Sequence, residues 1–204
     1  MNIFFILSLM SSPLWAQFLP DSFKANYEER YLSATQNKEK KSNGVIHYQH
    51  PRKLRFEVIK PDPALFISNP QNSWYYTPPF IEGEEGQVVI QEPNKLILIK
   101  LLDVLRQGLV DNKFYKVKKE NISATLFFNS PYEKEFKMDK VILHSLKKMA
   151  EVKNIKDLSE LDLFYQNGQK VTLGFSQFES PVSFSEDHFV FKIPPKTKVT
   201  KESP

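Results

Sequence analysis

The 204-residue sequence contains no cysteine and only six glycines. Without cysteine the chain can form neither a disulfide framework nor a thiolate metal site, and it has no cysteine nucleophile or N-terminal acylation site. With so few glycines it also lacks a glycine-rich loop of the kind that cradles phosphate groups. These absences argue against a nucleotide-binding site and against an acylated membrane anchor.

Catalytic motifs are missing as well. The sequence has no Gly-x-Ser-x-Gly nucleophile elbow and no His-Glu-x-x-His zinc motif. His47 and His50 have a spacing found in metal sites, but residues three apart on a strand project to opposite faces, so the two rings do not meet one ion. We therefore predict no catalytic residues, no metal site and no cofactor.

The charge balance is modest. The formal net charge is +4, and the positive residues occur in short runs such as 38–41 and 147–148. Such runs are typical of a solvated surface, and no nucleic-acid-binding motif accompanies them. Nucleic acid is therefore not an expected partner.

The N-terminus has the pattern of an export signal. Residues 1–16 hold an apolar core followed by Ser-Ser-Pro-Leu-Trp-Ala, and they carry no lysine or arginine. The apolar run is shorter than the roughly 20 residues that a membrane-spanning helix needs. We predict a signal peptide cleaved near Ala16, with a buried N-terminal helix and an uncleaved anchor as alternatives. The remainder, residues 17–204, has the length of one domain.

Short β-strands separated by proline turns dominate the stretch 44–79. Leu54, Phe56 and Val58 alternate with charged residues, which is the pattern of a strand with one dry face. The same pattern and its turns predict strands at 23–31, 44–49, 53–59, 64–68, 73–77, 86–91, 122–128, 140–146, 158–166, 169–178 and 188–193. Residues 35–44 are expected to form a loop, Asn167-Gly168 a type I′ hairpin turn, and 147–157 either a hairpin arm or a partial helix.

One helix is expected among these strands, over residues 93–108. It opens with Pro93 and closes with Gly108, and its polar residues Lys100, Asp103 and Gln107 share one narrow stripe. Apolar side chains cover the rest of its circumference, so the helix is either an ordinary core helix or a lid over a cavity. Its apolar residues include Leu96, Ile97, Leu98, Leu101, Leu102 and Leu105.

Four segments together resemble one known family. They are His-Pro-Arg-Lys-Leu-Arg-Phe at 50–56, Trp-Tyr-Tyr at 74–76, Gly-Gln-Lys-Val-Thr-Leu-Gly-Phe at 168–175 and Phe-Val-Phe-Lys-Ile-Pro-Pro at 189–195. In this order, and behind an export signal, they resemble the signature of LolA-type outer-membrane lipoprotein carrier proteins. The resemblance covers roughly residues 23–199.

The resemblance implies a mainly β fold with a helical lid, in which an unclosed antiparallel β-barrel, or half-barrel, covers a hydrophobic cavity. From the strand pattern we expect this acyl-chain cavity to be lined by Leu54, Phe56, Val58, Phe66, Trp74, Tyr76, Phe175, Phe189 and Phe191. From sequence alone, a sheet filled by its helix is the alternative to a hollow interior.

The resemblance also implies a function. A monomeric periplasmic carrier would take acylated lipoproteins from a lipoprotein-releasing ABC transporter of the inner membrane and deliver them to an outer-membrane lipoprotein receptor. Another exported module, one that binds lipid or senses lipoproteins, is the first alternative, and an enzyme on a β scaffold is the second.

A latch for the lid is a further expectation. The family places an arginine before the strand proline, and His50 occupies that position here. Strand alternation would put Arg52 on the same face as Leu54, so we predict that Arg52, helped by His50, reaches carbonyl groups of the lid. A solvated arginine at the start of the strand is the alternative.

Overall fold

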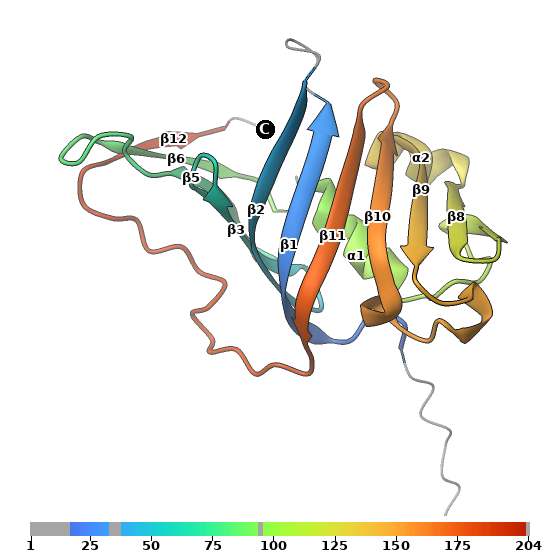
Figure 1. Ribbon diagram of the computed structural model, residues 1–204. Coiled ribbons are helices and arrows are strands. Elements are labelled where there is room, and N and C mark those ends of the chain that lie inside the picture. The colour runs from blue at the N-terminus through green and yellow to red at the C-terminus, as the bar shows by residue number, and fades with distance from the viewer. Residues whose placement is uncertain (1–16, 33–37, 94–95, 203–204) are drawn as a thin grey trace, which may run out of the picture.

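The computed structural model describes residues 17–32, 38–93 and 96–202. The predicted signal peptide and its cleavage point lie outside these residues. The described chain is built around a single curved sheet of twelve strands, with a helix on its concave side (Figure 1).

The strands of the sheet are β1 (Ser22–Leu32), β2 (Glu39–Gln49), β3 (Lys53–Lys60), β4 (Ala64–Ser68), β5 (Ser73–Thr77), β6 (Gly86–Gln91), β7 (Tyr115–Lys119), β8 (Ser123–Phe128), β9 (Met138–Ser145), β10 (Leu158–Tyr165), β11 (Lys170–Glu179) and β12 (Thr197–Lys201). The helices are α1 (Ile97–Leu105) and α2 (Ser130–Phe136), with two 3₁₀ turns, η1 (Met149–Glu151) and η2 (Ile155–Asp157).

The sheet is open. Its strand order is β12-β6-β5-β4-β3-β2-β1-β11-β10-β9-β8-β7, so β12 and β7 are the outermost strands. Neighbours pair antiparallel except β12 and β6, which are parallel. α1 lies behind β11 and β10 in the view of Figure 1. The predicted unclosed, mainly antiparallel sheet with a helix over its inner face is confirmed.

Alternation along the strands sorts the side chains to the two faces. On β2, Ile46 and Tyr48 are fully buried beneath α1, whereas His47 between them points to the outer face. On β3, Leu54, Phe56 and Val58 point inward, and Leu54 pairs with Tyr48. The main hydrophobic core therefore lies between the inner face of the sheet and the two helices.

The sheet requires a glycine where β2 and β3 approach each other most closely. A Cβ atom added to Gly44 would lie 1.7 Å from the backbone oxygen of Glu57 and 2.9 Å from the ring of Tyr27. The register of β2 and β3 also shifts between Asn43 and Gly44. No residue with a side chain fits this position without moving the backbone of β3.

Several predicted segments differ from the structure. Residues 39–44 belong to β2 rather than to a loop, because β1 pairs with them along its whole length. Residues 188–193 are not a strand, because Phe189 and Phe191 pack onto other strands from an irregular segment. The strands β7 and β12 and the helix α2 were not predicted, and the ambiguous stretch 147–157 contains η1 and η2.

The β10–β11 hairpin was predicted at the right place with the wrong turn. A type I′ turn needs positive φ at both central residues, but only Gly168 adopts it (φ 81°). The backbone N–H of Gly168 donates to the oxygen of Tyr165, and the N–H of Tyr165 donates to the oxygen of Gln169. These bonds enclose three loop residues, so the turn is one residue longer than expected.

Candidate functional site

An apolar cavity of about 350 Å³ lies between the inner face of the sheet and the beginning of α1. Its lining comes from β1, β3, β4, β5, β10, β11 and the start of the helix: Glu29, Phe56, Val58, Ala64, Phe66, Tyr75, Leu96, Ile97, Leu98, Leu163, Tyr165, Val171 and Leu173. Glu29 is the only charged side chain among these lining residues. The space can therefore hold a hydrocarbon and offers little to a polar ligand.

The helix α1 covers the cavity with one end and fills the core with the other. Leu96, Ile97 and Leu98 line the cavity at the N-terminal end. Leu101, Leu102 and Leu105, toward the C-terminal end, are almost fully buried in the main core. The end of the helix is therefore an ordinary core helix and its start borders the cavity; a lid role for the start stays a prediction.

The predicted cavity residues separate into three groups. Phe56, Val58 and Phe66 line the cavity. Leu54 belongs to the neighbouring core and Phe175 packs against that core, so neither residue lines the cavity. The remaining four lie in a second cluster on the opposite face of the sheet, so their prediction as lining residues was wrong: Trp74, Tyr76, Phe189 and Phe191.

The register of β4 and β5 explains this error. Phe66 pairs with Tyr75, and Ile67 pairs with Trp74. Directly paired residues share a face, so Tyr75 faces the cavity with Phe66, whereas Trp74 faces outward with Ile67. Because side chains alternate along β5, the neighbouring rings of Trp74 and Tyr75 point to opposite faces of the sheet.

Polar contacts anchor the C-terminal half of α1 to the sheet. The hydroxyl of Tyr48 donates to Asp103 Oδ1 at 2.6 Å, and His50 Nδ1 lies 3.4 Å from the same oxygen. Burial and the hydrogen bond to Asp103 both raise the pKa of Tyr48, so the phenol stays protonated and keeps donating. We call this trio the Tyr48–Asp103–His50 anchor.

Two further contacts hold the end of the helix. Arg106 forms an ion pair with Asp21 (Nη1 to Oδ1, 2.6 Å), and Arg106 is largely buried. The hydroxyl of Tyr115 donates to the backbone oxygen of Gly108 at 2.8 Å, with Val104 O at 3.3 Å. Burial raises the pKa of Tyr115 to about 12, so this hydroxyl also remains a donor at neutral pH.

Arg52 does not occupy the position that strand alternation suggested. It lies in the turn before β3 with a positive φ of 59°, and it is exposed. It borders an open groove beside Asp103 but forms no hydrogen bond with any residue that the structure describes. His50 does contact the lid, through a side chain rather than through carbonyl groups. A latch role for Arg52 stays a prediction.

The Tyr48–Asp103–His50 anchor can be tested by mutation. Replacing Tyr48 with phenylalanine keeps the buried ring and removes the hydroxyl, so we expect Y48F to weaken the docking of the C-terminal half of α1 on the sheet by about 1–2 kcal/mol. Because the chain has no cysteine, a Leu102→Cys reporter beside Asp103 is the sole thiol, and its maleimide labelling rate should rise about tenfold in Y48F.

Tyr132→Phe is the matched control, because the Tyr132 ring packs on Phe114 while its hydroxyl makes no hydrogen bond with the described residues. Equal labelling of the reporter in Y48F and Y132F would refute the anchor.

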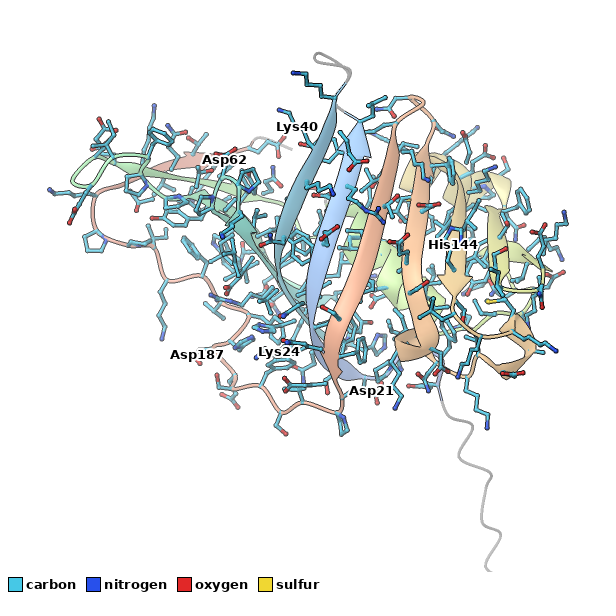
Figure 2. All side chains as sticks on the ribbon, viewed as in Figure 1. Asp21, Lys24, Lys40, Asp62, His144 and Asp187 are labelled. Atoms are coloured by element: carbon cyan, nitrogen blue, oxygen red, sulfur yellow. The ribbon has the colours of Figure 1, made fainter. Side chains whose placement is uncertain are left out.

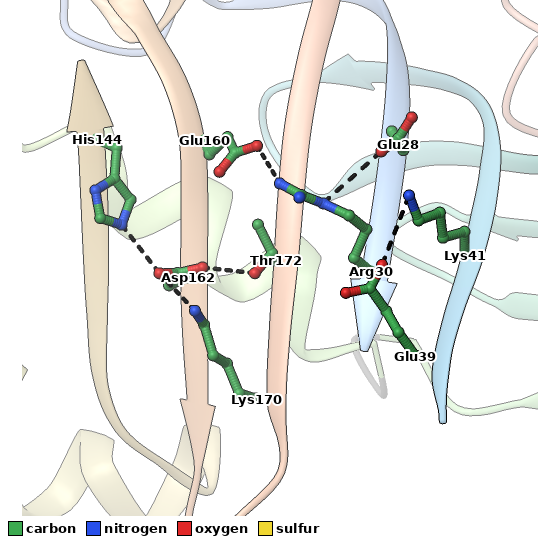
Figure 3. A network of polar contacts seen from close by, with 9 residues as sticks. All are labelled: Glu28, Arg30, Glu39, Lys41, His144, Glu160, Asp162, Lys170 and Thr172. Carbon is green, nitrogen blue, oxygen red and sulfur yellow. Dashed lines mark hydrogen bonds and ion pairs between the residues drawn. The ribbon is translucent and has the colours of Figure 1, made fainter. Parts of the chain in front are cut away.

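A second polar cluster lies on the outer face of the sheet (Figure 3). The nearly buried Asp162 accepts hydrogen bonds from Thr172 (2.6 Å) and contacts Lys170 and His144 (3.0 Å each). Although burial opposes ionisation, these partners hold the pKa of Asp162 below its ordinary value. The contacts of Asp162 link β9, β10 and β11. The cluster lies across the sheet from the cavity and is therefore not part of the cavity site.

Sequence reasoning missed most of the anchoring residues. Asp103 was recognised only as part of a polar stripe, and Tyr48 was not singled out but only fell within the predicted strand 44–49. A tyrosine on the dry face of a strand, together with one carboxylate on a mostly apolar helix, was the available signal for a buried contact.

Within the described residues no group of three His, Asp or Glu side chains is arranged as a metal site, and no helix is long and apolar enough to cross a bilayer.

Comparisons with known proteins agree with the geometry of the site. Residues 20–192 match the family model described as outer membrane lipoprotein carrier protein LolA. A relative from Photobacterium profundum, named outer-membrane lipoprotein carrier protein, is 25% identical over 197 residues, covering 92% of this chain and 90% of its own. A relative of the same name from Dechloromonas aromatica is 28% identical over 79 residues, covering 37% of this chain and 38% of its own.

Among solved structures, the chain is similar to an uncharacterized conserved protein from Thermus thermophilus. The TM-score is 0.50 at 11% sequence identity, and the match covers 90% of this chain and 92% of the other. At this identity the likeness shows the fold alone.

Proposed function

Because the chain belongs to the LolA family of outer membrane lipoprotein carrier proteins, we propose that it carries acylated lipoproteins from an inner-membrane ABC transporter to an outer-membrane receptor. The family is one of carriers and not of enzymes. The observation that best supports carriage of an acyl group is the apolar cavity between the sheet and the start of α1.

The cargo explains why such a cavity is needed. Moving an acyl chain from a membrane into water costs about 0.8 kcal/mol for each methylene group, so three chains of roughly 14 methylenes each face a barrier on the order of 30 kcal/mol. Free diffusion of a lipoprotein between two membranes is therefore excluded. A carrier lowers this barrier by offering a lining of Phe56, Val58, Phe66 and similar residues in place of water.

The cavity as it stands is smaller than such a cargo. At about 350 Å³ it is at the low end of pockets that hold a single drug-sized ligand. Three acyl chains need more room, so loading requires α1 to move. The contacts favour movement at the start of the helix, because Leu96, Ile97 and Leu98 touch the cavity only through apolar side chains. Further along, Lys100 pairs with Glu135 of α2, Asp103 accepts a hydrogen bond from Tyr48 of β2, and Arg106 pairs with Asp21 just before β1.

The proposed cycle therefore has a closed empty state and an open loaded state. The anchored C-terminal half of α1 acts as the hinge, and the N-terminal half swings away as acyl chains enter. We further propose that the carrier is residues 17–204, a monomeric domain released into the periplasm after cleavage near Ala16. The shuttle needs no anchor of its own, and the chain has no cysteine that could carry one.

Native mass spectrometry of the protein purified from the periplasm of its own host tests the proposal. We expect one-to-one complexes with acylated lipoproteins that dissociate when outer-membrane receptor is added. Bound phospholipid without lipoprotein would favour a general lipid-binding module, and a consistently empty protein would contradict carriage.

A further inference from the structure

The segment between β11 and β12, residues 180–196, crosses the outer face of the sheet, on the side opposite α1 (Figure 1). We call it the strap. It contains no helix or strand. Phe189 packs with Ile67, Trp74 and Val88 in the second hydrophobic cluster, and its backbone oxygen accepts a hydrogen bond from Asn69 Nδ2 at 3.0 Å. The strap thus covers an apolar patch that would otherwise face solvent.

A pair of histidines joins the strap to the sheet beside this patch. His188 Nε2 lies 2.9 Å from Nδ1 of His47, which projects outward near the C-terminal end of β2. The ring of Phe184, also from the strap, stacks on His188 with 4.6 Å between centroids. At 2.9 Å one nitrogen must donate and the other accept, so the contact holds one proton and not two.

The strands around His47 make a second proton costly. In the register of the sheet, His47 pairs with Lys24 of β1 on one side and with Arg55 of β3 on the other. Its Nε2 atom is buried and has no hydrogen-bond partner among the described residues, so an imidazolium would leave an N–H group unsatisfied. Glu57 is the nearby group that favours the charged form. Burial and the facing His188 lower the pKa of His47 to about 4 despite Glu57.

The charged residues of the strap do not offset the cost of protonating His47. Asp187 is adjacent to His188, but its carboxylate is engaged by Lys192 Nζ at 2.8 Å and by the hydroxyl of Ser185. Figure 2 shows Asp187 on the strap and Lys24 on β1 at the same end of the sheet. Burial and the neighbouring Arg55 lower the pKa of His188, with Glu57 and Asp187 acting in the opposite direction.

We propose that the His47–His188 contact is a pH-sensitive clasp, which keeps the strap on the sheet near neutral pH and releases it in mildly acidic solution, exposing the apolar patch around Trp74. The clasp is independent of what the cavity carries, because it lies on the other face of the sheet.

The direction in which pH shifts strap closure follows from proton linkage. With the strap released, His47 has its ordinary pKa of 6.5, so the open state binds a proton as the pH falls below this value while the closed state does not until near pH 4. The closed state is therefore favoured above pH 6.5 and loses stability as the pH falls toward 4. Allowing for partial exposure, His47 alone shifts the equilibrium on the order of tenfold between pH 7 and pH 5.

Tryptophan fluorescence can follow the strap directly. The chain has two tryptophans, Trp15 and Trp74, so a Trp15→Phe background leaves Trp74, beneath the strap, as the sole reporter. We expect iodide or acrylamide quenching of Trp74 to rise reversibly between pH 7 and pH 5, with unchanged far-ultraviolet circular dichroism. H47Q, which removes the ring that carries the proton linkage, should abolish this rise. H188R, which places a permanent cation against His47, should give the pH 5 quenching at pH 7.5.

His144→Gln is the matched control. His144 lies on the same outer face but contacts Asp162 instead of the strap, so H144Q should keep the pH transition. A quenching rise that persists in H47Q, a flat wild-type profile, or an H188R variant that remains closed would each overturn the clasp. So would a transition that coincides with loss of secondary structure, because the strap would then not open on its own.

Discussion

Replacing Val58 with glutamate (V58E) is expected to lower retention of an acylated cargo by about 100-fold. Val58 lines the apolar cavity from β3, so a carboxylate there contacts the cargo's hydrocarbon in place of a methyl group. Placing an unpaired charge against apolar groups costs several kcal/mol, and a 100-fold loss corresponds to about 2.7 kcal/mol. The measurement is equilibrium binding of a fluorescent triacylated lipopeptide to the purified protein.

The next residue along the strand is a matched control. Ile59 points to the outer face and is 49% exposed, so I59E adds the same charge to the same strand without entering the cavity. We expect I59E to bind the lipopeptide as the wild type does. Equal loss in both variants would show that charge on β3, and not the cavity, determines binding, and tight binding by V58E would place the cargo elsewhere.

Gly44→Ala is expected to destabilise the protein by about 3 kcal/mol. Its new methyl group would lie 1.7 Å from the backbone oxygen of Glu57, and this atom belongs to a paired strand that cannot move alone. Overpacking in a rigid environment costs about 1–3 kcal/mol, and contact with backbone puts this case at the upper end. Urea unfolding measures the change in the free energy of unfolding.

Gly174→Ala, on β11, provides the comparison. Its added Cβ would have its nearest neighbour at 3.7 Å, which is ordinary van der Waals contact. We expect G174A to change the free energy of unfolding by less than about 1 kcal/mol. If the two alanine variants were equally stable, the close approach of β2 and β3 would not be a constraint on the fold.

The fold could be predicted where local patterns decide the structure. The bounds of β4 and β5 were correct, because proline turns and alternating residues act within a few positions. β7 and β12 were missed because their short, lysine-rich sequences gain strand structure only by pairing with β8 and β6. Residues 188–193 have a strand-like alternation of phenylalanines, but contacts with the outer face of the sheet replaced hydrogen-bonded pairing.

The site could be predicted only in part, because alternation identifies two faces without saying which one is inside. Val58 and Phe66 do line the apolar cavity, since they continue the apolar face of adjoining strands, and their contact with acyl chains stays a prediction. Trp74 and Tyr76 were placed on the wrong face, because the aromatic run at 74–76 offers apolar rings to both sides. The link from Tyr48 to Asp103 spans 55 positions and depends on where α1 docks, which no local pattern contains.

The two ends of the open sheet bear on how the protein behaves at high concentration. An unclosed sheet exposes unpaired backbone groups on its outermost strands, and such strands can pair with another chain and start aggregation. Here both outermost strands are rich in lysine: Lys116, Lys118 and Lys119 on β7, and Lys198 and Lys201 on β12. Edge-to-edge association would strip these lysines of water and break the ion pairs of Lys116 with Asp111 and of Lys118 with Glu120. The sheet can therefore stay open for its cargo while its lysine-rich edges resist pairing with another copy of the protein.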